Sequence, residues 1–284
     1  MSDNFQQALA DALPVLQKIR GGFGPHPTGT LAALAKIKAT VEKAPATSPE
    51  ASARGISAKS PTPSAGKPDA APAVPPPGPD EPLEILRKAA LACVKCPHLV
   101  KSRTQVVFGV GNPNAELMFV GEAPGADEDE HGEPFVGKAG QLLTRIIQVM
   151  GFSREEIYIG NVLKCRPNMP PGESGNRKPK PEEMQTCLPW LEKQIAIIKP
   201  RALVALGATA VEGLLGNTEP VGKLRGRWLD FHGIPVMTTY HPAYLLRNQS
   251  IAEKRKVWED MLLVLEKLEK PISEKQRQFF TKAG

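Results

Sequence analysis

A glycine-rich, acidic stretch at residues 121–140, GEAPGADEDEHGEPFVGKAG, has the residue types that a small-ligand site needs. Glycines let the backbone approach a ligand closely, carboxylates can steer or activate water, and Phe135 offers a face on which a planar base can stack. Taken alone, Phe135 could equally be a core residue, and the acidic run could be a solvated loop. The stretch is a candidate site only if other polar residues converge on it.

Two polar residues farther along the chain are candidates for that convergence. Asn161, in YIGNVLKC, supplies an amide whose donor and acceptor can pair with the edge of a pyrimidine. His241, in TTYHPAYLLRN, supplies a ring N–H that can stabilise negative charge developing on an oxygen. Alone, Asn161 could cap a strand end and His241 could be structural. Together with Phe135 they predict a site for a flat, polar heterocycle.

Part of the same stretch, GEPFVGKAG at residues 132–140, resembles the phosphate-binding loop of nucleotide hydrolases. That loop needs Ser or Thr after its lysine to hold magnesium, but Ala139 follows Lys138. It also needs a buried strand before its first glycine, where this chain has the acidic run ADEDEH. The sequence therefore argues against nucleotide hydrolysis.

The four cysteines predict a metal site. CVKC can place two thiolates on one centre, and the two later cysteines could complete a tetrahedral zinc site or bind an iron–sulfur cluster. Spacing alone does not separate these metals, and four unrelated cysteines remain an alternative. We expect no disulfides, because the sequence shows no secretory signal. The candidate ligands are Cys93, Cys96, Cys165 and Cys187.

The elements that must position these residues alternate between strands and helices. Strands are predicted at AELMFVG, EIYIGNVLKC, PRALVALG and IPVMTTYHP, separated by amphipathic helices, of which KAGQLLTRIIQVM should end at Gly151. This alternation predicts an α/β fold, with a four-stranded, mostly parallel sheet between two helical layers. Ligands of such sheets bind at the carboxyl ends of the strands, where GEAPG, Asn161, Gly207 and His241 all fall.

The composition divides the chain into four predicted regions. Residues 1–43 show helical spacing and form a short extension that could bind a protein partner. Residues 44–81 are rich in Pro, Ala and Ser and are expected to be a disordered linker. Residues 82–270 form the folded domain, and residues 271–284 form a tail.

Net charge and hydropathy bear on whether the protein binds nucleic acid and whether it spans a membrane. A formal charge of +6 permits an acidic partner such as nucleic acid. The sequence has no run of eighteen apolar residues and no secretory signal, so we expect a cytoplasmic protein with no membrane span.

From about residue 84 to residue 267 the chain resembles a family 4 uracil-DNA glycosylase, the iron–sulfur branch of that superfamily. The motifs that carry the resemblance are GEAPGADEDEHGEPFVGKAGQLL, YIGNVLKCRP, GNRKPKPEEMQTC, ALVALGATA and TYHPAYLLRN. The resemblance implies a three-layer α/β/α glycosylase fold and a DNA repair enzyme. Such an enzyme flips uracil out of single- or double-stranded DNA and hydrolyses its N-glycosidic bond, and this one is expected to act as a monomer.

The resemblance also implies roles for individual residues. The four cysteines would hold a structural [4Fe–4S] cluster. Phe135 would stack on the flipped uracil, Asn161 would read its edge, and His241 would stabilise charge on uracil O2. Backbone groups of the first loop would line the site, at Gly121, Glu122 and Ala123.

The water-activating residue is less clear, because Ala123 occupies the position where a better-studied branch has Asp. Glu122 and then Glu128 are the nearest carboxylates, and either could orient water or offset an oxocarbenium-like charge. Leu245 and Leu246 could enter the space left by the flipped base while Arg247 meets a phosphate, or they could be core leucines at the start of a helix. Arg177 and Lys178, in GNRKPK, could hold further phosphates.

Two departures from the family pattern bear on the function. The segment between Cys165 and Cys187 is longer than expected, which a loop tolerates. A related branch forms a covalent bond to the abasic sugar through His in an inserted loop, but LGNTEPVGKLRGRW contains no His, which favours hydrolysis. The alternative hypothesis is a non-catalytic iron–sulfur protein that binds DNA in replication or repair.

Overall fold

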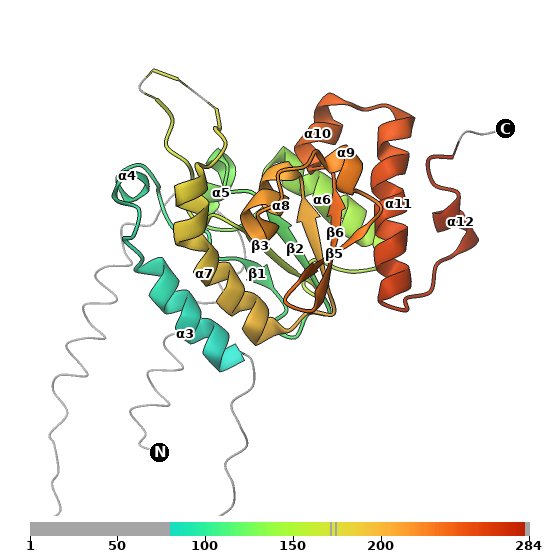
Figure 1. Ribbon diagram of the computed structural model, residues 1–284, viewed down its shortest axis with the longest axis horizontal. Coiled ribbons are helices and arrows are strands. Elements are labelled where there is room, and N and C mark those ends of the chain that lie inside the picture. The colour runs from blue at the N-terminus through green and yellow to red at the C-terminus, as the bar shows by residue number, and fades with distance from the viewer. Residues whose placement is uncertain (1–79, 171, 174, 282–284) are drawn as a thin grey trace, which may run out of the picture. The chain divides into compact units, whose positions relative to one another are not determined.

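The computed structural model describes residues 80–170, 172–173 and 175–281 (Figure 1). The predicted helical extension, and all but the last two residues of the predicted linker, lie outside this part of the chain. Helix α3 spans Asp80–Leu91, so the folded region begins two residues before the predicted boundary at residue 82. The helix ends at Leu91, just before Cys93, the first of the four cysteines.

A six-stranded mixed sheet forms the centre of the fold. Its strand order is β1-β3-β2-β4-β6-β5, and the four middle strands are parallel. They coincide with the four strands expected from the sequence, so the predicted parallel sheet is confirmed and two antiparallel edge strands extend it. The strands are β1 Val110–Gly111, β2 Leu117–Gly121, β3 Tyr158–Asn161, β4 Ala202–Leu206, β5 Trp228–Phe231 and β6 Ile234–Thr239.

Helices cover both faces of this sheet, which confirms the three-layer α/β/α architecture. Alternate residues of β2 point to opposite faces: Met118 and Val120 belong to one apolar core, and Leu117 and Phe119 to the other. The first core packs against α3, α7 and α8, and the second against α6 and α11 (Figure 1). These helices are α6 Lys138–Met150, α7 Pro181–Ile198, α8 Ala208–Leu215 and α11 Ile251–Lys267.

Local sequence explains several element ends. Helix α6 ends at Gly151, as predicted, because its φ of +93° is a conformation that glycine adopts without strain. Helix α11 begins after Ser250, whose hydroxyl accepts a hydrogen bond from the Glu253 N–H. The β5–β6 hairpin turns through His232 and Gly233, both with positive φ, as a tight two-residue turn requires.

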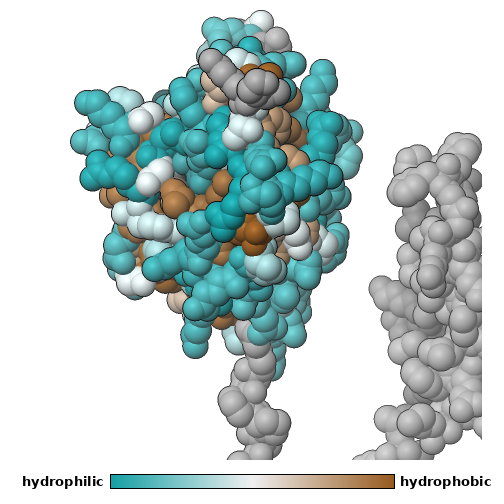
Figure 2. Space-filling view, turned by 90° about the vertical axis from the view of Figure 1, so that its right-hand side faces the viewer, coloured by the Kyte–Doolittle hydropathy of each residue, from teal (hydrophilic) through white to brown (hydrophobic). Residues whose placement is uncertain are grey.

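Five short helices complete the described chain: α4 Pro97–Val100, α5 Ala126–His131, α9 Val221–Leu224, α10 Pro242–Arg247 and α12 Glu274–Arg277. The last of them lies in the predicted tail and packs on α11, where the Trp258 indole N–H donates to the Gln276 carbonyl at 2.5 Å. The surface on this side is mostly hydrophilic, with small apolar patches (Figure 2). Among residues 80–281, as far as they are described, no helix is long and apolar enough to cross a membrane.

Candidate active site

Parallel strand pairing brings the predicted site residues to one edge of the sheet. Gly121, at the end of β2, pairs with Asn161 at the end of β3. Strand β6 ends at Thr239, two residues before His241, and pairs with β4, which Gly207 follows. The carboxyl ends of all four parallel strands therefore meet at this edge, as the sequence predicted.

Gly121 lies where two of the predicted ligand-binding side chains meet. A Cβ atom built on this glycine would lie 2.3 Å from Asn161 Oδ1 and 2.5 Å from Phe135 Cζ. Both distances are far below van der Waals contact, so any side chain at this position would displace its neighbours. The absence of a side chain allows Asn161 and Phe135 to approach each other across the end of β2.

Phe135 and His241 form the other side of the site. Their ring centroids are 5.6 Å apart and their planes differ by 30°, so the rings are roughly stacked. Phe135 adopts a φ of +57°, a left-handed conformation that is unfavourable for a bulky residue. Such strain persists only where surrounding contacts enforce it, and it is often found at binding sites.

Asn161 carries an unsatisfied hydrogen-bond acceptor. The residue is 2% exposed, and its Oδ1 atom has no hydrogen-bond partner in the described part of the chain. An unpaired buried acceptor costs about 1–3 kcal/mol, so such atoms call for a specific explanation. A ligand that brings an N–H group to Oδ1 would remove this cost.

The hydrogen bonds of His241 fix which ring nitrogen carries the proton. Nδ1 accepts a hydrogen bond from the Ala243 N–H at 3.1 Å, so Nε2 carries the proton of the neutral ring and is a donor. Burial, assisted by the positive charge of Arg247, lowers the pKa of His241 to about 4. At neutral pH the ring is therefore an uncharged N–H donor.

The carboxylate of Glu122 lies near Thr209, Lys178 and Glu212, on the side of the first loop that faces α8. Burial raises its pKa above the ordinary value, and the Glu212 charge adds to this effect. A hydrogen bond from Thr209 and the charge of Lys178 act in the opposite direction. A carboxylate with a raised pKa is a better general base than an ordinary glutamate.

Glu128 holds the loop that carries Phe135. Its Oε1 atom accepts hydrogen bonds from the N–H groups of Val136 and Gly137, both at 3.0 Å, and Oε2 accepts one from Gly125 at 3.1 Å. Both oxygens are thus engaged with the backbone of this loop, and the predicted role of Glu128 in orienting water stays a prediction. The amide of Asn176 also reaches this turn, since Nδ2 would lie 3.2 Å from a Cβ on Gly125.

Ala123 packs against the small apolar cluster that contains Cys165 and Cys187. Its side chain is a methyl group and cannot activate water. Its predicted contribution through backbone groups stays a prediction.

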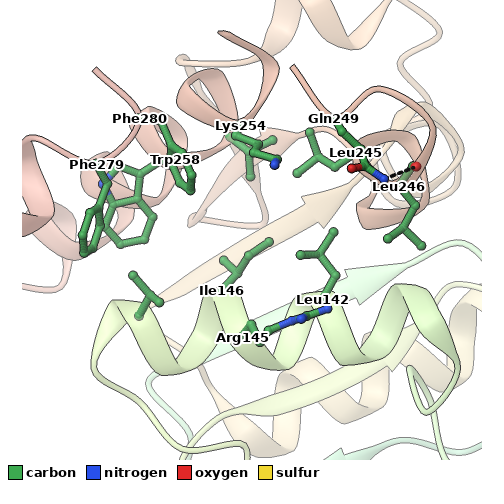
Figure 3. A pocket seen from close by; sticks show the side chains of 12 residues that line it. Leu142, Arg145, Ile146, Leu245, Leu246, Gln249, Lys254, Trp258, Phe279 and Phe280 are labelled. Atoms are coloured by element: carbon green, nitrogen blue, oxygen red, sulfur yellow. Dashed lines mark hydrogen bonds between the residues drawn. The ribbon is translucent and has the colours of Figure 1, made fainter. Parts of the chain in front are cut away.

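The two leucines predicted to enter DNA differ in exposure. Leu245 is 5% exposed and packs in the interior, which contradicts its predicted insertion. Leu246 is 36% exposed and Arg247 is also exposed, so both can contact DNA. The two leucines border an apolar groove of about 650 Å³ between α6, α10, α11 and the C-terminal segment, where Leu142 and Ile146 of α6 lie on the opposite side and Trp258 lies at the other end, beside Phe279 (Figure 3).

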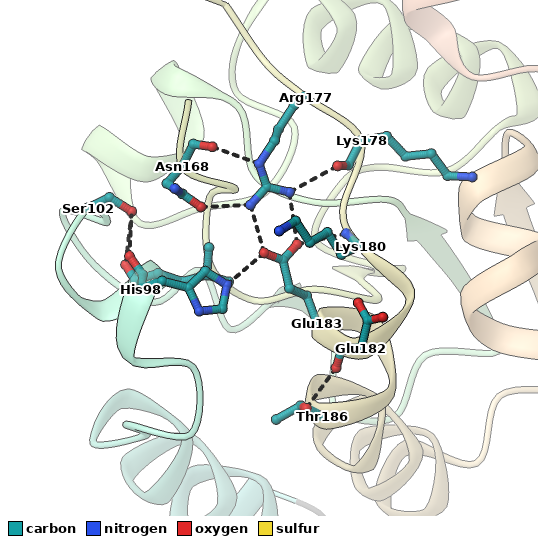
Figure 4. Close-up of polar contacts among 10 residues, drawn as sticks. His98, Ser102, Asn168, Arg177, Lys178, Lys180, Glu182, Glu183 and Thr186 are labelled. Atoms are coloured by element: carbon teal, nitrogen blue, oxygen red, sulfur yellow. Dashed lines mark hydrogen bonds and ion pairs between the residues drawn. The ribbon is translucent and has the colours of Figure 1, made fainter. Parts of the chain in front are cut away.

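Arg177 is bound within the protein, which contradicts its predicted role as a phosphate contact. Its guanidinium donates to both carboxylate oxygens of the buried Glu183, at 2.7 and 2.9 Å, and to Asn168 (Figure 4). Together with His98, which lies 2.7 Å from Glu183, it lowers the pKa of that carboxyl to about 2 despite burial. Lys178 is more exposed and pairs with Glu212 at 2.5 Å.

The four cysteines lie close enough to interact. Cys165 and Cys187 are buried, Cys96 packs against them, and Cys93 influences the pKa values of all three. Burial raises these pKa values, that of Cys187 to about 12. N–H groups point to two sulfurs, from Arg103 to Cys165 at 3.0 Å and from the Lys164 backbone to Cys187 at 3.2 Å.

This sulfur-only set fits zinc or an iron–sulfur cluster by its chemistry. Within the described residues, no three possible ligands surround a single point at the distances of one metal ion. A cluster is larger than one ion and does not require such an arrangement. The N–H groups directed at the sulfurs would stabilise thiolates in either case.

Comparison with known proteins identifies the family. Residues 108–262 match the family model described as the uracil DNA glycosylase superfamily. A type-4 uracil-DNA glycosylase of Thermotoga maritima is 43% identical over 208 residues, which span 72% of this chain and 98% of that protein. The chain belongs to the type-4 uracil-DNA glycosylase family.

Other relatives agree with this assignment. A type-4 uracil-DNA glycosylase of Pyrobaculum aerophilum is 44% identical over 60% of this chain and 87% of its own length. A type-5 uracil-DNA glycosylase of the same organism is 30% identical over 55% of this chain and 80% of its own length.

Sequence reasoning missed two buried charged groups. Lys164 and Glu183 are both almost fully buried, and each has bonding partners distant in sequence. A lysine in the apolar context of NVLKC was a usable signal, because an unpaired lysine is rarely buried. Glu183, in the first turn of a helix, gave no such signal.

Proposed function

We propose that the protein removes uracil from DNA by hydrolysing the N-glycosidic bond and leaves an abasic site. The observation that carries this proposal is the unpaired Asn161 acceptor beside the Phe135 ring, since together they complement a flat heterocycle with an N–H on its edge. Membership of the type-4 family supports the same activity. We use "base site" below for Gly121, Phe135, Asn161 and His241.

Recognition in the base site follows from the chemistry of uracil. The base stacks on Phe135, and its N3–H donates to Asn161 Oδ1, which satisfies the buried acceptor. Cytosine has a lone pair at N3 and cannot make this bond with Oδ1 in the same orientation. Flipping costs a few kcal/mol and is easiest for a mispaired or single-stranded base, so these substrates should react well.

Bond cleavage needs stabilisation of charge at both ends of the breaking bond. As the bond from N1 to the sugar C1′ breaks, uracil departs with the bonding electrons, and the His241 Nε2–H donates to O2. Water adds to C1′ and gives its proton to the Glu122 carboxylate, to which we also assign the orientation of this water, because burial raises its pKa. Glu128 positions the loop that carries Phe135.

We further propose that the four cysteines hold a [4Fe–4S] cluster. The sulfur donors and the two N–H groups directed at them support this assignment. When bound, the cluster would link the α3–α4 segment, the end of β3 and helix α7, which carry its four ligands. It takes no part in bond cleavage in this proposal.

The decisive experiment is single-turnover cleavage of uracil-containing oligonucleotides by protein purified without oxygen, with its visible absorbance recorded. Uracil release by a protein with iron–sulfur absorbance supports both assignments. The base-site assignment is tested with Asn161→Ala and His241→Ala, each expected to lose most activity while remaining folded. Tight DNA binding without uracil release would instead favour a non-catalytic DNA-binding protein.

A further inference from the structure

A buried lysine lies directly behind the base site. Lys164 is 1% exposed, three residues after Asn161, and its Nζ atom donates to the Asn161 carbonyl at 2.9 Å. No carboxylate pairs with it in the described part of the chain, although burial of an ammonium group without an ion pair is costly. The groups that its Nζ atom contacts therefore bear on why a lysine is kept at this position.

The contacts of Lys164 are fixed by a neighbouring glutamine. Gln194 uses both N–H groups of its amide, one to the Phe108 carbonyl at 3.0 Å and one to the Tyr158 hydroxyl at 2.9 Å. Its Oε1 atom must therefore be the acceptor for Lys164 Nζ, at 2.5 Å. Nζ also lies 6.0 Å from the centre of the Phe108 ring, within the range of a cation–π contact.

The backbone of Lys164 connects the end of β3 to the cysteines. Its N–H group donates to Cys187 Sγ at 3.2 Å, and its carbonyl accepts a hydrogen bond from the Val107 N–H at 2.8 Å. The next residue is Cys165. One residue thus joins the end of β3, helix α7 through Gln194, and the cysteine segment.

We propose that Lys164 is a positioning residue that acts through Asn161. Its hydrogen bond holds the Asn161 carbonyl and so fixes the direction from which the Asn161 side chain meets the uracil edge. This inference rests on the proposed function, because it assigns base reading to Asn161. Lys164 itself is fully buried and does not touch DNA or the base.

The test uses Lys164→Met, which keeps the length of the side chain and removes its N–H donors. We expect single-turnover uracil excision to slow about 10- to 100-fold, the range for loss of one hydrogen bond from a charged group. Inhibition by free uracil should weaken by a similar factor, whereas affinity for abasic-site DNA should stay within about twofold, because no base is held there. Lys88→Met, the same substitution on the exposed face of α3, is the matched control and should behave as wild type.

A double-mutant cycle separates positioning from a general structural role. If Lys164 acts through Asn161, Lys164→Met should have little further effect in an Asn161→Ala background. A full additional loss in that background, or wild-type excision by folded Lys164→Met, would overturn the inference. Failure of the wild-type protein to release uracil would instead reject the proposed function.

If Lys164→Met does not fold, Lys164→Gln takes its place in the cycle, because its amide keeps a donor and avoids an unpaired buried charge. Excision by this variant should be intermediate between wild type and a variant without the donor. The reduction in excision rate caused by Lys164→Gln should again depend on the presence of the Asn161 side chain. Equal losses with and without Asn161 would count against the proposal.

Discussion

Substitution of Gly121 by alanine is the sharpest test of the base site. The new methyl group would lie 2.3 Å from Asn161 Oδ1 and 2.5 Å from Phe135 Cζ, whereas ordinary contacts begin at 3.4 Å. Both side chains must therefore move by about 1 Å, a misplacement that can reduce catalysis by about 10²-fold. The overpacking should also lower the free energy of unfolding by about 1–3 kcal/mol.

The assay compares single-turnover uracil excision at a temperature where all variants are folded, as urea unfolding establishes. Gly160→Ala is the matched control, because its Cβ would lie 3.5 Å from Lys164 Nζ and 3.6 Å from Met118 Cε, both ordinary contacts. We expect Gly160→Ala to keep its activity within a few-fold of wild type. A folded Gly121→Ala protein that cleaves at the wild-type rate would show that uracil does not bind between Asn161 and Phe135.

Three further predictions follow from charge and exposure. The excision rate should stay level as the pH falls through 6.5, because the His241 ring stays neutral down to about pH 4, and it should first drop as Glu122, whose pKa is raised by burial, gains a proton. The stability that the neutral His241 ring contributes is fully present above pH 6.5 and is lost as the pH falls from 6.5 to about 4; a pH series of excision rates and urea midpoints will check both. Arg177→Ala should cost about 2–4 kcal/mol in urea unfolding, because it leaves the buried Glu183 carboxylate short of a partner, and it should not change the salt dependence of DNA binding, since the guanidinium is already bound to Glu183 and Asn168. Leu246→Ala should slow excision from duplex DNA more than from single strands, whereas Leu245→Ala should mainly reduce stability; equal slowing on both substrates would argue against insertion of Leu246.

The fold was largely predictable because its central strands are apolar and separated by amphipathic helices. Their order along the chain also placed Asn161 and His241 at one edge, since parallel strands end on the same side. The edge strand β1 was missed because two residues carry no periodic signal. Strand β5 is partly exposed and mixed in composition, so its pairing with β6 became visible only in three dimensions.

The roles of charged and apolar side chains near the site were harder to predict. Arg177 and Lys178 are neighbours in a basic turn, but only Arg177 lies within reach of Glu183. Leu245 and Leu246 are also neighbours, and the rotation of α10 on the domain decides which one is buried. Which of two neighbouring residues is buried or bound depends on tertiary packing, and sequence spacing does not show this.

The strained backbone of Phe135 has a consequence for the cost of binding DNA. Its left-handed conformation costs about 1–2 kcal/mol and is enforced from both sides. Glu128 binds the N–H groups that follow it, and Gly140 packs so closely that a Cβ there would lie 1.8 Å from the Phe135 carbonyl oxygen.

The ring is therefore ordered when the protein folds and not when a base arrives, so little conformational entropy is lost on binding. The amides of Val136 and Gly137 should accordingly exchange their hydrogens with solvent as slowly as those of the core strands, although they lie outside any helix or strand.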